Sequence, residues 1–209
     1  MLRVRAPDSD RDRALLLFGG SFNPVHNGHL ALARFALERC GVERVLFIPN
    51  GDNYNKPDLA PAAQRLGMVQ AATAGEPAFE VVDAEAVSRK KLRVVQTTQE
   101  LRRRYPDHEL VLLRSLDSLP RTHNKLFGVQ GLRVLVLDRE GAGQTFDQVL
   151  ASRRHLLANR GRVTYAPGFS DPTSATAVRR AVAAGQPVAQ MVPPAVAEII
   201  AREGLYLTP

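Results

Sequence analysis

Short, wholly apolar runs alternate along this chain with segments in which apolar residues recur every three or four positions. The first pattern is typical of buried strands, and the second is typical of helices that bury one face. The sequence predicts strands at residues 14–18, 45–48, 79–83, 110–113, 132–137 and 163–166. It predicts helices from Leu30 to near Gly41 and at residues 61–74, 94–105, 146–159, 174–184 and 194–202.

Strands that alternate with helices and are apolar along their whole length indicate a parallel sheet that is covered on both faces. We therefore predict an α/β fold with a Rossmann-like, doubly wound parallel sheet and C-terminal helices. In such sheets, ligands bind beyond the carboxyl ends of the strands. The segments that follow Phe18, Ile48, Leu113 and Ala166 are therefore expected to converge on one site.

A length of 209 residues suits one well-buried domain. Residues 1–13 alternate charged and small polar residues without the apolar segment of a secretory signal, so we expect a flexible leader followed by a single domain at residues 14–209. No run of eighteen apolar residues occurs, and no membrane span is expected. Cys40 is the only cysteine, which excludes an internal disulfide and fits the cytoplasmic location that we predict.

The formal net charge of +7 indicates an acidic substrate or partner. Arginines on solvated helix faces, such as Arg102 to Arg104, explain the excess equally well. No basic motif interleaved with aromatic residues is present, so no nucleic-acid partner is expected. The sequence leaves assembly into a homo-oligomer open.

The segment of residues 19–29, between the first predicted strand and the first predicted helix, has the features of a phosphate site. Gly19 and Gly20 let the backbone approach an anion closely and point its amides at it. His26 and His29 are three residues apart, so they share one face at a helix start, where the helix N-terminus favours an anion. Metal ligation by the two histidines is the alternative. We predict no protein-held metal, because the remaining histidines lie in segments without ligand spacing: His108, His123 and His155.

Residues 19–30 resemble the H-x-G-H signature of the adenylyltransferase superfamily, and above all the nicotinate/nicotinamide mononucleotide adenylyltransferases. The run Ser174-Ala-Thr-Ala-Val-Arg179 is similar to that family's S-x-T-x-I-R signature, and residues 193–206 are similar to its closing helix and tail. The resemblance implies transfer of AMP from ATP to a pyridine mononucleotide in NAD biosynthesis, with release of pyrophosphate. ATP and a mononucleotide are thus the implied partners.

The resemblance also implies which residues bind ATP. The implied catalytic contacts to its phosphates come from His26, His29 and Arg179. Further ATP contacts are implied for Gly19, Gly20, Ser21, Phe22, Gly28, Lys56, Ser174 and Thr176. Judged by residue type alone, Ser174 and Thr176 could be helix caps, Arg179 a surface arginine and Lys56 a solvated loop charge.

The simplest chemistry for these parts is direct displacement at the α-phosphorus of ATP. The attacking phosphate of the acceptor is already ionised at neutral pH, so no general base is needed. Catalysis would come from alignment and from neutralised phosphate charge, with Mg²⁺ as the partner of the triphosphate. No serine occupies a G-x-S-x-G elbow, and the sequence gives no sign of an activated nucleophile.

The acceptor half departs from the family pattern. The resemblance implies acceptor contacts from Asn23, Thr97 and Asp117, although the family's Gly-x-Asp is here Ser115-Leu-Asp117, and Asp117 is also a good turn cap. The family's tryptophan, which stacks on the pyridine ring, has no counterpart because the chain contains no tryptophan. The corresponding stretch is residues 122–125, and candidates to replace the ring are Phe127, Tyr54 and His123.

Other functions share these features. The same chemistry could serve another phosphorylated acceptor, such as phosphopantetheine or a sugar or alcohol phosphate. A nucleotide sensor without turnover is the alternative outside enzymes. Class I aminoacyl-tRNA synthetases carry a similar histidine signature, but this chain is short and lacks a Lys-Met-Ser-Lys-Ser-type loop and an anticodon-binding extension.

Overall fold

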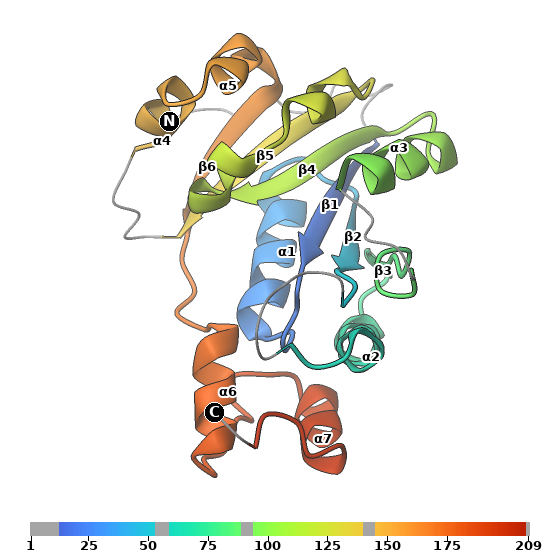
Figure 1. The fold of residues 1–209 in the computed structure, drawn as a ribbon, viewed down its shortest axis with the longest axis vertical. Helices are drawn as coiled ribbons and strands as arrows, with labels where there is room; N and C mark the ends of the chain where they lie inside the picture. The colour runs from blue at the N-terminus through green and yellow to red at the C-terminus, as the bar shows by residue number, and fades with distance from the viewer. Residues whose placement is uncertain (1–12, 53–58, 89–93, 140–144, 208–209) are drawn as a thin grey trace. The chain divides into compact units, whose positions relative to one another are not determined.

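A computed structural model describes residues 13–52, 59–88, 94–139 and 145–207 (Figure 1). The strands are β1 (Ala14–Gly20), β2 (Arg44–Pro49), β3 (Phe79–Val81), β4 (Glu109–Ser115), β5 (Leu132–Arg139) and β6 (Val163–Phe169). The helices are α1 (Asn27–Arg39), α2 (Ala62–Thr73), α3 (Val94–Arg104), α4 (Phe146–Ala151), α5 (Arg154–Ala158), α6 (Ala175–Ala183) and α7 (Pro194–Arg202). Short 3-10 turns form η1 (Leu116–Arg121), η2 (Asn124–Gly128) and η3 (Arg160–Arg162).

The six strands form one parallel sheet in the order β3-β2-β1-β4-β5-β6, flanked by helices, and this confirms the predicted Rossmann-like α/β fold (Figure 1). In the parallel β1–β4 pair, the register runs from Ala14 opposite Glu109 to Leu17 opposite Leu112. The chain first builds the sheet outward from β1 to β3 and then returns to the other side of β1. Such a reversal of strand order is the place where this class of sheet binds ligands.

The described residues divide into two compact units, each assembled from distant parts of the chain. The first unit contains β1 as far as Phe18, the segment Phe35–Val45 and the elements from α3 to β6. The second contains Gly19–Arg34, the chain from Leu46 through α2 and β3, and everything described from Asp171 onward. The single domain over residues 14–209 stays a prediction, and almost all of the expected leader lies outside the described residues.

Burial in the first unit follows the apolar runs of the sequence. All of Ala14 to Phe18 is buried along β1, as expected for a strand covered on both faces. A cluster of buried side chains from η1, β5, α4 and α5 packs with the rings of Phe146 and Tyr165, which stack with centroids 4.8 Å apart. This packing holds the segment after β4 against the sheet.

One local expectation was wrong, and one stretch forms elements that were not predicted. The helix predicted at residues 146–159 is divided into α4 and α5, because Arg153 takes an extended conformation. The break lets Leu150 and Leu156 enter one buried cluster, whereas in a continuous helix they would lie about 120° apart around the axis. The stretch after β4, for which no element was expected, forms η1 and η2.

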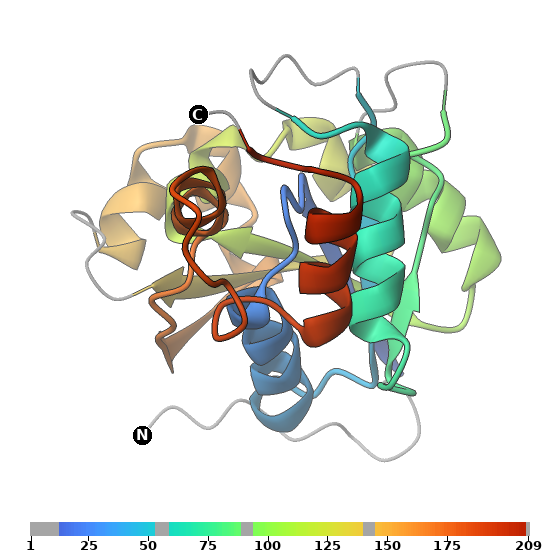
Figure 2. The same ribbon diagram turned by 90° about the horizontal axis from the view of Figure 1, so that it is seen from below.

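In the second unit, α7 packs against α2, and the two helices lie side by side in Figure 2. Val196 and Ile200, one turn apart on α7, are buried, as are Met68 and Val69 of α2.

None of the helices in the described ranges is long and apolar enough to cross a membrane. Cys40 forms no disulfide, and burial raises the pKa of its thiol to about 11.

We expect truncation of the buried face of β1 to destabilise the fold. Leu16→Ala should lower the free energy of unfolding by about 2–5 kcal/mol, because Leu16 is fully buried and the change leaves a cavity. Urea denaturation monitored by circular dichroism measures this effect. Leu157→Ala is the matched control, since Leu157 is 55% exposed, and it should change the stability by less than about 0.5 kcal/mol. Equal effects of both substitutions would contradict the packing described for β1.

Candidate functional site

The predicted phosphate loop leaves the end of β1 in a conformation that packing maintains. Phe22 has a backbone φ of 46°, a value that residues other than glycine rarely adopt. Its ring is only 2% exposed and lies 5.1 Å from the ring of His29 and 5.7 Å from that of Phe47. A Cβ on Gly20 would lie 3.1 Å from the Phe22 ring, so glycine makes room for it. Packing of the Phe22 ring therefore maintains the conformation of the loop.

The two histidines of the H-x-G-H segment lie together, as their spacing predicted. Their ring centroids are 3.7 Å apart at the start of α1. The backbone N–H of His26 donates to Nδ1 of His29 over 3.2 Å, so Nδ1 is an acceptor and a neutral His29 carries its proton on Nε2. His29 is half-buried, whereas His26 is buried. His29 thus combines a fixed ring with an N–H donor on its far side.

Gly28 is required by the close approach of another segment. A Cβ at this position would lie 2.6 Å from Oδ1 of Asp171 and 3.2 Å from Cε1 of His26. The Asp171 carboxylate is itself held by the backbone N–H of Thr173, which donates to Oδ1 over 2.8 Å. The glycine of the signature therefore lets the segment that leads into α6 lie against the start of α1.

The second signature opens α6, and its three polar residues differ in their contacts. Ser174 is the N-cap, and its Oγ accepts the backbone N–H of Ala177 over 3.1 Å, which is the capping role considered for it. Thr176 is exposed in the first turn. Arg179, one turn further, donates from Nη1 to the backbone carbonyl of Asn23 over 2.9 Å. Arg179 is therefore bound to the phosphate loop and is no solvated surface arginine.

The two signatures, at opposite ends of the sequence, are brought together in the second unit. Besides the bond from Arg179 to Asn23, the backbone N–H of Asn27 donates to the carbonyl of Met191 over 2.9 Å. The Asn27 side chain also donates to the carbonyl of Gln190 over 3.1 Å. The start of α1 is thus joined to the segment between α6 and α7, as a site shared by both signatures requires.

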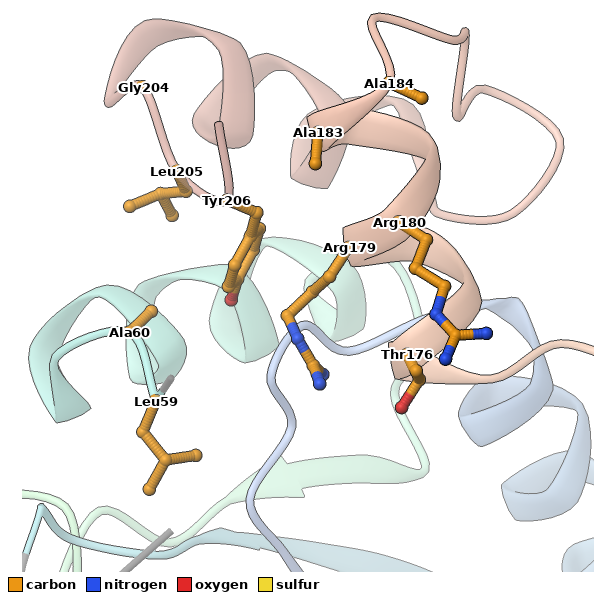
Figure 3. A pocket seen from close by; sticks show the side chains of 10 residues that line it. All are labelled: Leu59, Ala60, Thr176, Arg179, Arg180, Ala183, Ala184, Gly204, Leu205 and Tyr206. Atoms are coloured by element: carbon orange, nitrogen blue, oxygen red, sulfur yellow. The ribbon is translucent and has the colours of Figure 1, made fainter. Parts of the chain in front are cut away.

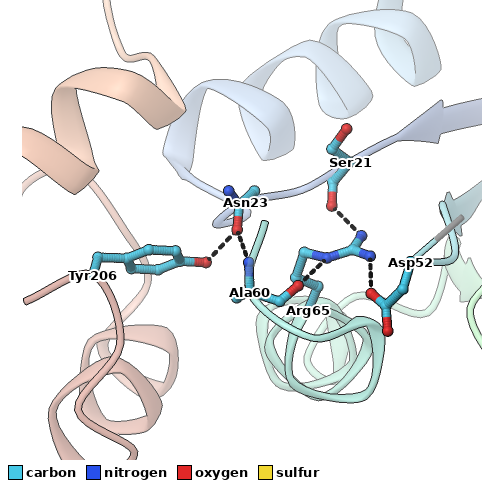
Figure 4. Close-up of polar contacts among 6 residues, drawn as sticks. All are labelled: Ser21, Asn23, Asp52, Ala60, Arg65 and Tyr206. Carbon is cyan, nitrogen blue, oxygen red and sulfur yellow. Dashed lines mark hydrogen bonds and ion pairs between the residues drawn. The ribbon is translucent and has the colours of Figure 1, made fainter. Parts of the chain in front are cut away.

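Arg65 of α2 supports the phosphate loop, and the sequence reasoning missed it (Figure 4). Its side chain is completely buried. Nε donates to the carbonyl of Ala60 over 2.7 Å, and Nη1 donates to the carbonyl of Ser21 over 2.7 Å. Nη2 reaches Oδ1 of Asp52 over 3.1 Å. The available signal was the helical period of α2, since Arg65 shares its buried face with Ala62, Met68 and Val69.

Tyr206, in the C-terminal tail, also binds the loop (Figure 4). Its hydroxyl donates to Oδ1 of Asn23 over 2.8 Å, and the backbone N–H of Ala60 donates to the same oxygen over 3.0 Å. Burial raises the pKa of the Tyr206 phenol, and the charges of Arg179 and Arg65 oppose this shift. Asn23, expected to contact the acceptor, thus uses its side-chain oxygen within the protein.

Two further residues expected at the acceptor belong to the first unit. Asp117 is exposed in the first turn of η1, whereas Thr97 is only 3% exposed in α3. Their contact with an acceptor stays a prediction. Lys56 and Tyr54 lie outside the described residues.

Of the rings considered as replacements for tryptophan, Phe127 is buried and His123 is exposed. Phe127 packs in the buried cluster of the first unit, and the Arg162 guanidinium lies over its ring, 5.7 Å from the centroid. His123 caps η2 by accepting the backbone N–H of Lys125 at Nδ1 over 3.1 Å. The described structure therefore makes His123 the candidate for a ring contact from this stretch.

Two side chains donate hydrogen bonds to backbone carbonyls in the segment between β4 and β5. Arg162 donates to the carbonyls of Phe127, Val129 and Leu132, the last two over 2.9 Å. His155 donates from Nε2 to the carbonyl of Thr122 over 2.8 Å. Hydrogen bonds from both side chains therefore fix the backbone of the segment after β4, which we call the braced segment.

Across the described ranges, no group of three or more His, Cys, Asp or Glu side chains could hold a metal ion.

Comparison with known proteins shows the family to which this chain belongs. Residues 17–181 match the sequence model of the cytidylyltransferase-like family. A protein of Neisseria meningitidis named "Probable nicotinate-nucleotide adenylyltransferase" is 36% identical over 202 residues, which cover 91% of this chain and 96% of that protein. A protein of the same name from Thermomicrobium roseum is 36% identical over 199 residues, covering 92% and 91%. The chain therefore belongs to the nicotinate-nucleotide adenylyltransferases within the cytidylyltransferase-like family.

Solved structures agree in fold. The nicotinic acid mononucleotide adenylyltransferase of Plasmodium falciparum, solved with NaAD, has a TM-score of 0.72 at 13% identity, covering 94% of this chain and 98% of that one. A putatively assigned nicotinate-nucleotide adenylyltransferase of Vibrio parahaemolyticus has a TM-score of 0.60 at 16% identity, covering 94% and 97%. At these identities the likeness concerns the fold alone.

Substitution of Gly28 tests the close approach of Asp171. In an ordinary helix, Gly→Ala stabilises by about 0.5–1 kcal/mol. Here Gly28→Ala should lower the melting temperature, because the new Cβ would meet the Asp171 carboxylate at 2.6 Å. Adding Asp171→Ala should recover part of the loss, because the carboxylate is removed while the Thr173 amide loses its acceptor. Gly19→Ala should have little effect, because no heavy atom lies within 4 Å of that position. Stabilisation by Gly28→Ala alone would contradict this geometry.

Removal of the Tyr206 hydroxyl tests the link between tail and loop. Tyr206→Phe should lower the free energy of unfolding by about 1 kcal/mol, because Asn23 loses a donor. Burial raises the folded-state pKa of Tyr206, so the stabilisation from its neutral form is complete below the unfolded pKa of about 10 and is lost as the pH rises above it. Urea denaturation at rising alkaline pH should therefore show a smaller loss in Tyr206→Phe than in the unsubstituted protein. Identical pH profiles would refute this.

Proposed function

We propose that this chain transfers AMP from ATP to the 5′-phosphate of nicotinate mononucleotide, releasing pyrophosphate and forming the dinucleotide. The observation that carries the proposal is the 2.9 Å hydrogen bond from Arg179 to the carbonyl of Asn23, which joins the H-x-G-H loop to the helix of the second signature. The names of the relatives, which match over nine-tenths of the chain, support the choice of acceptor.

The reaction is a single displacement. An oxygen of the acceptor phosphate attacks the α-phosphorus of ATP, and the new P–O bond forms as the bond to the oxygen bridging to the β-phosphorus breaks. Pyrophosphate leaves with that electron pair. Because the attacking phosphate is already ionised, no side chain has to remove a proton, and the protein contributes alignment and charge neutralisation.

The residues take different parts in this proposal. His29 donates from Nε2 to the transferring phosphate, since its Nδ1 is occupied by the His26 amide. Arg179 neutralises phosphate charge from the first turns of α6, beside the exposed Thr176 hydroxyl. Ser174 is a positioning residue, because its Oγ caps α6 and thereby orients the helix N-terminus. The amides of Gly19, Gly20, Ser21, Phe22 and Gly28 complete the proposed ATP contacts.

A divalent metal generally accompanies ATP in adenylyltransferases, and we propose that it is Mg²⁺. It enters with ATP as part of the substrate, with phosphate and water oxygens as its main ligands. We also propose a cytoplasmic location.

The braced segment after β4 favours one alternative, which keeps the chemistry and changes the acceptor. Phe127 is buried in the core and His123 is the exposed ring of the stretch where the family's stacking residue would stand. Asp117, exposed in η1, is the proposed contact to the acceptor ribose. Another phosphorylated metabolite is therefore the second candidate acceptor.

One experiment separates these activities. Purified protein with ATP and Mg²⁺ is given nicotinate mononucleotide, nicotinamide mononucleotide, phosphopantetheine or a sugar phosphate, and pyrophosphate release is measured. Release with nicotinate mononucleotide supports the proposal, and release with a different acceptor alone selects the second candidate. Binding of ATP without release from any acceptor would overturn the enzymatic proposal in favour of a sensor.

Removal of the His29 ring tests the phosphate contact. His29→Ala should reduce turnover by about a hundredfold or more, as when one preorganised donor to a transition state is lost. His108→Ala is the matched control, because His108 lies in the first unit with its ring against Tyr105. Steady-state pyrophosphate release measures both variants. Turnover within a few-fold of normal in His29→Ala would exclude the assigned role.

A further inference from the structure

A cavity of about 640 Å³ opens on α6 within the second unit (Figure 3). Three segments line it: the chain just before α2, one face of α6, and the tail after α7. The lining residues of α6 and its C-cap Ala184 span 176–184 and lie within about 140° of one another around the helix axis. A volume of this size is within the range of about 300–1,000 Å³ that small-ligand sites occupy.

One end of the cavity is cationic and polar. Arg179 and Arg180 are adjacent on α6, and the exposed Thr176 lies one turn before Arg180. In Figure 3 the two guanidinium groups and the Thr176 hydroxyl point toward the same end. None of the described residues that line the cavity is acidic. Two guanidinium groups, each with several N–H donors, and a neighbouring hydroxyl suit the binding of a phosphate group.

Small apolar residues also line the cavity. Ala183, Ala184 and Gly204 line it together with the side chain of Leu205. Alanine and glycine at these positions leave a gap that a bulkier side chain would fill. Small apolar residues beside two cations match a ring that carries an anionic group.

The cavity overlaps the proposed triphosphate site only in part. Thr176 and Arg179 belong to both, whereas the H-x-G-H loop contributes no lining residue. Arg180, Ala184 and Leu205 have no role in the proposed reaction. The Arg179 side chain also donates to the carbonyl of Asn23, so a ligand that engages it acts on a residue that contacts the phosphate loop.

We propose that this cavity is a second nucleotide site, which binds a nucleoside monophosphate with its phosphate at Arg179 and Arg180 and its base over Ala183 and Ala184. The bound ligand occupies Arg179 and Thr176 and therefore opposes the binding of ATP. This competition rests on the proposed function, whereas the binding itself does not.

Calorimetric titration tests the binding with AMP as the probe, on the full chain. Ala184→Trp fills the space beside Ala183, where the base would bind, and Arg180→Met removes one cation. Each should weaken AMP binding by about tenfold or more, the first through loss of space for the ring and the second through loss of a charged hydrogen bond. Ala189→Trp is the matched control, because Ala189 is exposed and does not line the cavity; AMP binding should be unchanged. ATP should bind Ala184→Trp within about twofold of normal.

Two results would overturn the proposal. AMP binding that is unaffected by Ala184→Trp places AMP elsewhere, and ATP binding that weakens as much as AMP binding makes the cavity part of the ATP site itself. In turnover assays, AMP should raise the KM for ATP without changing kcat, and Ala184→Trp should abolish this inhibition. Because calorimetry needs no turnover, failure of the proposed reaction remains distinguishable from failure of this site.

Discussion

The phosphate loop depends on hydrogen bonds that converge on Asn23. Its backbone carbonyl accepts from Arg179, and its side-chain oxygen accepts from the Ala60 amide and the Tyr206 hydroxyl. Asn23 is buried, so each of these acceptors needs a donor from within the protein. The donors come from α6, from the segment before α2 and from the C-terminal tail. The conformation of a loop near the N-terminus is therefore set by residues that follow it by as many as 183 positions.

In each unit, arginine side chains also donate to several backbone carbonyls at once. Arg65 does this for Ser21 and Ala60, and Arg162 does it for Val129 after η2 and Leu132 at the start of β5. The guanidinium of Arg65 is fully buried and therefore costly to desolvate, and it is tolerated because its planar set of donors reaches several acceptors at once. Lysine could not reproduce either arrangement, since its donors radiate from one atom. Both arginines stiffen irregular backbone at places where the function needs a defined loop.

The two halves of the proposed reaction rest on different kinds of support. The triphosphate half uses backbone amides, a histidine with a defined tautomer and an arginine bound to the same loop, all within the second unit. The acceptor half uses the segment after β4, whose backbone is braced but whose exposed ring is His123. This difference follows from chemistry: phosphate recognition needs amides and cations, whereas selection among acceptors depends on which side chains a loop exposes.

The sequence alone determined the fold class and nearly all of the strands and helices, because apolar runs and helical spacing depend on neighbouring residues only. It also identified both signatures and the shared face of His26 and His29. Tertiary structure decided the rest. The break between α4 and α5 follows from burial of Leu150 and Leu156 in one cluster, and the capping role of Ser174 follows from the start of α6. The roles of Arg65 and Tyr206 depend on which distant carbonyl or amide each side chain meets, and no local pattern encodes that partner.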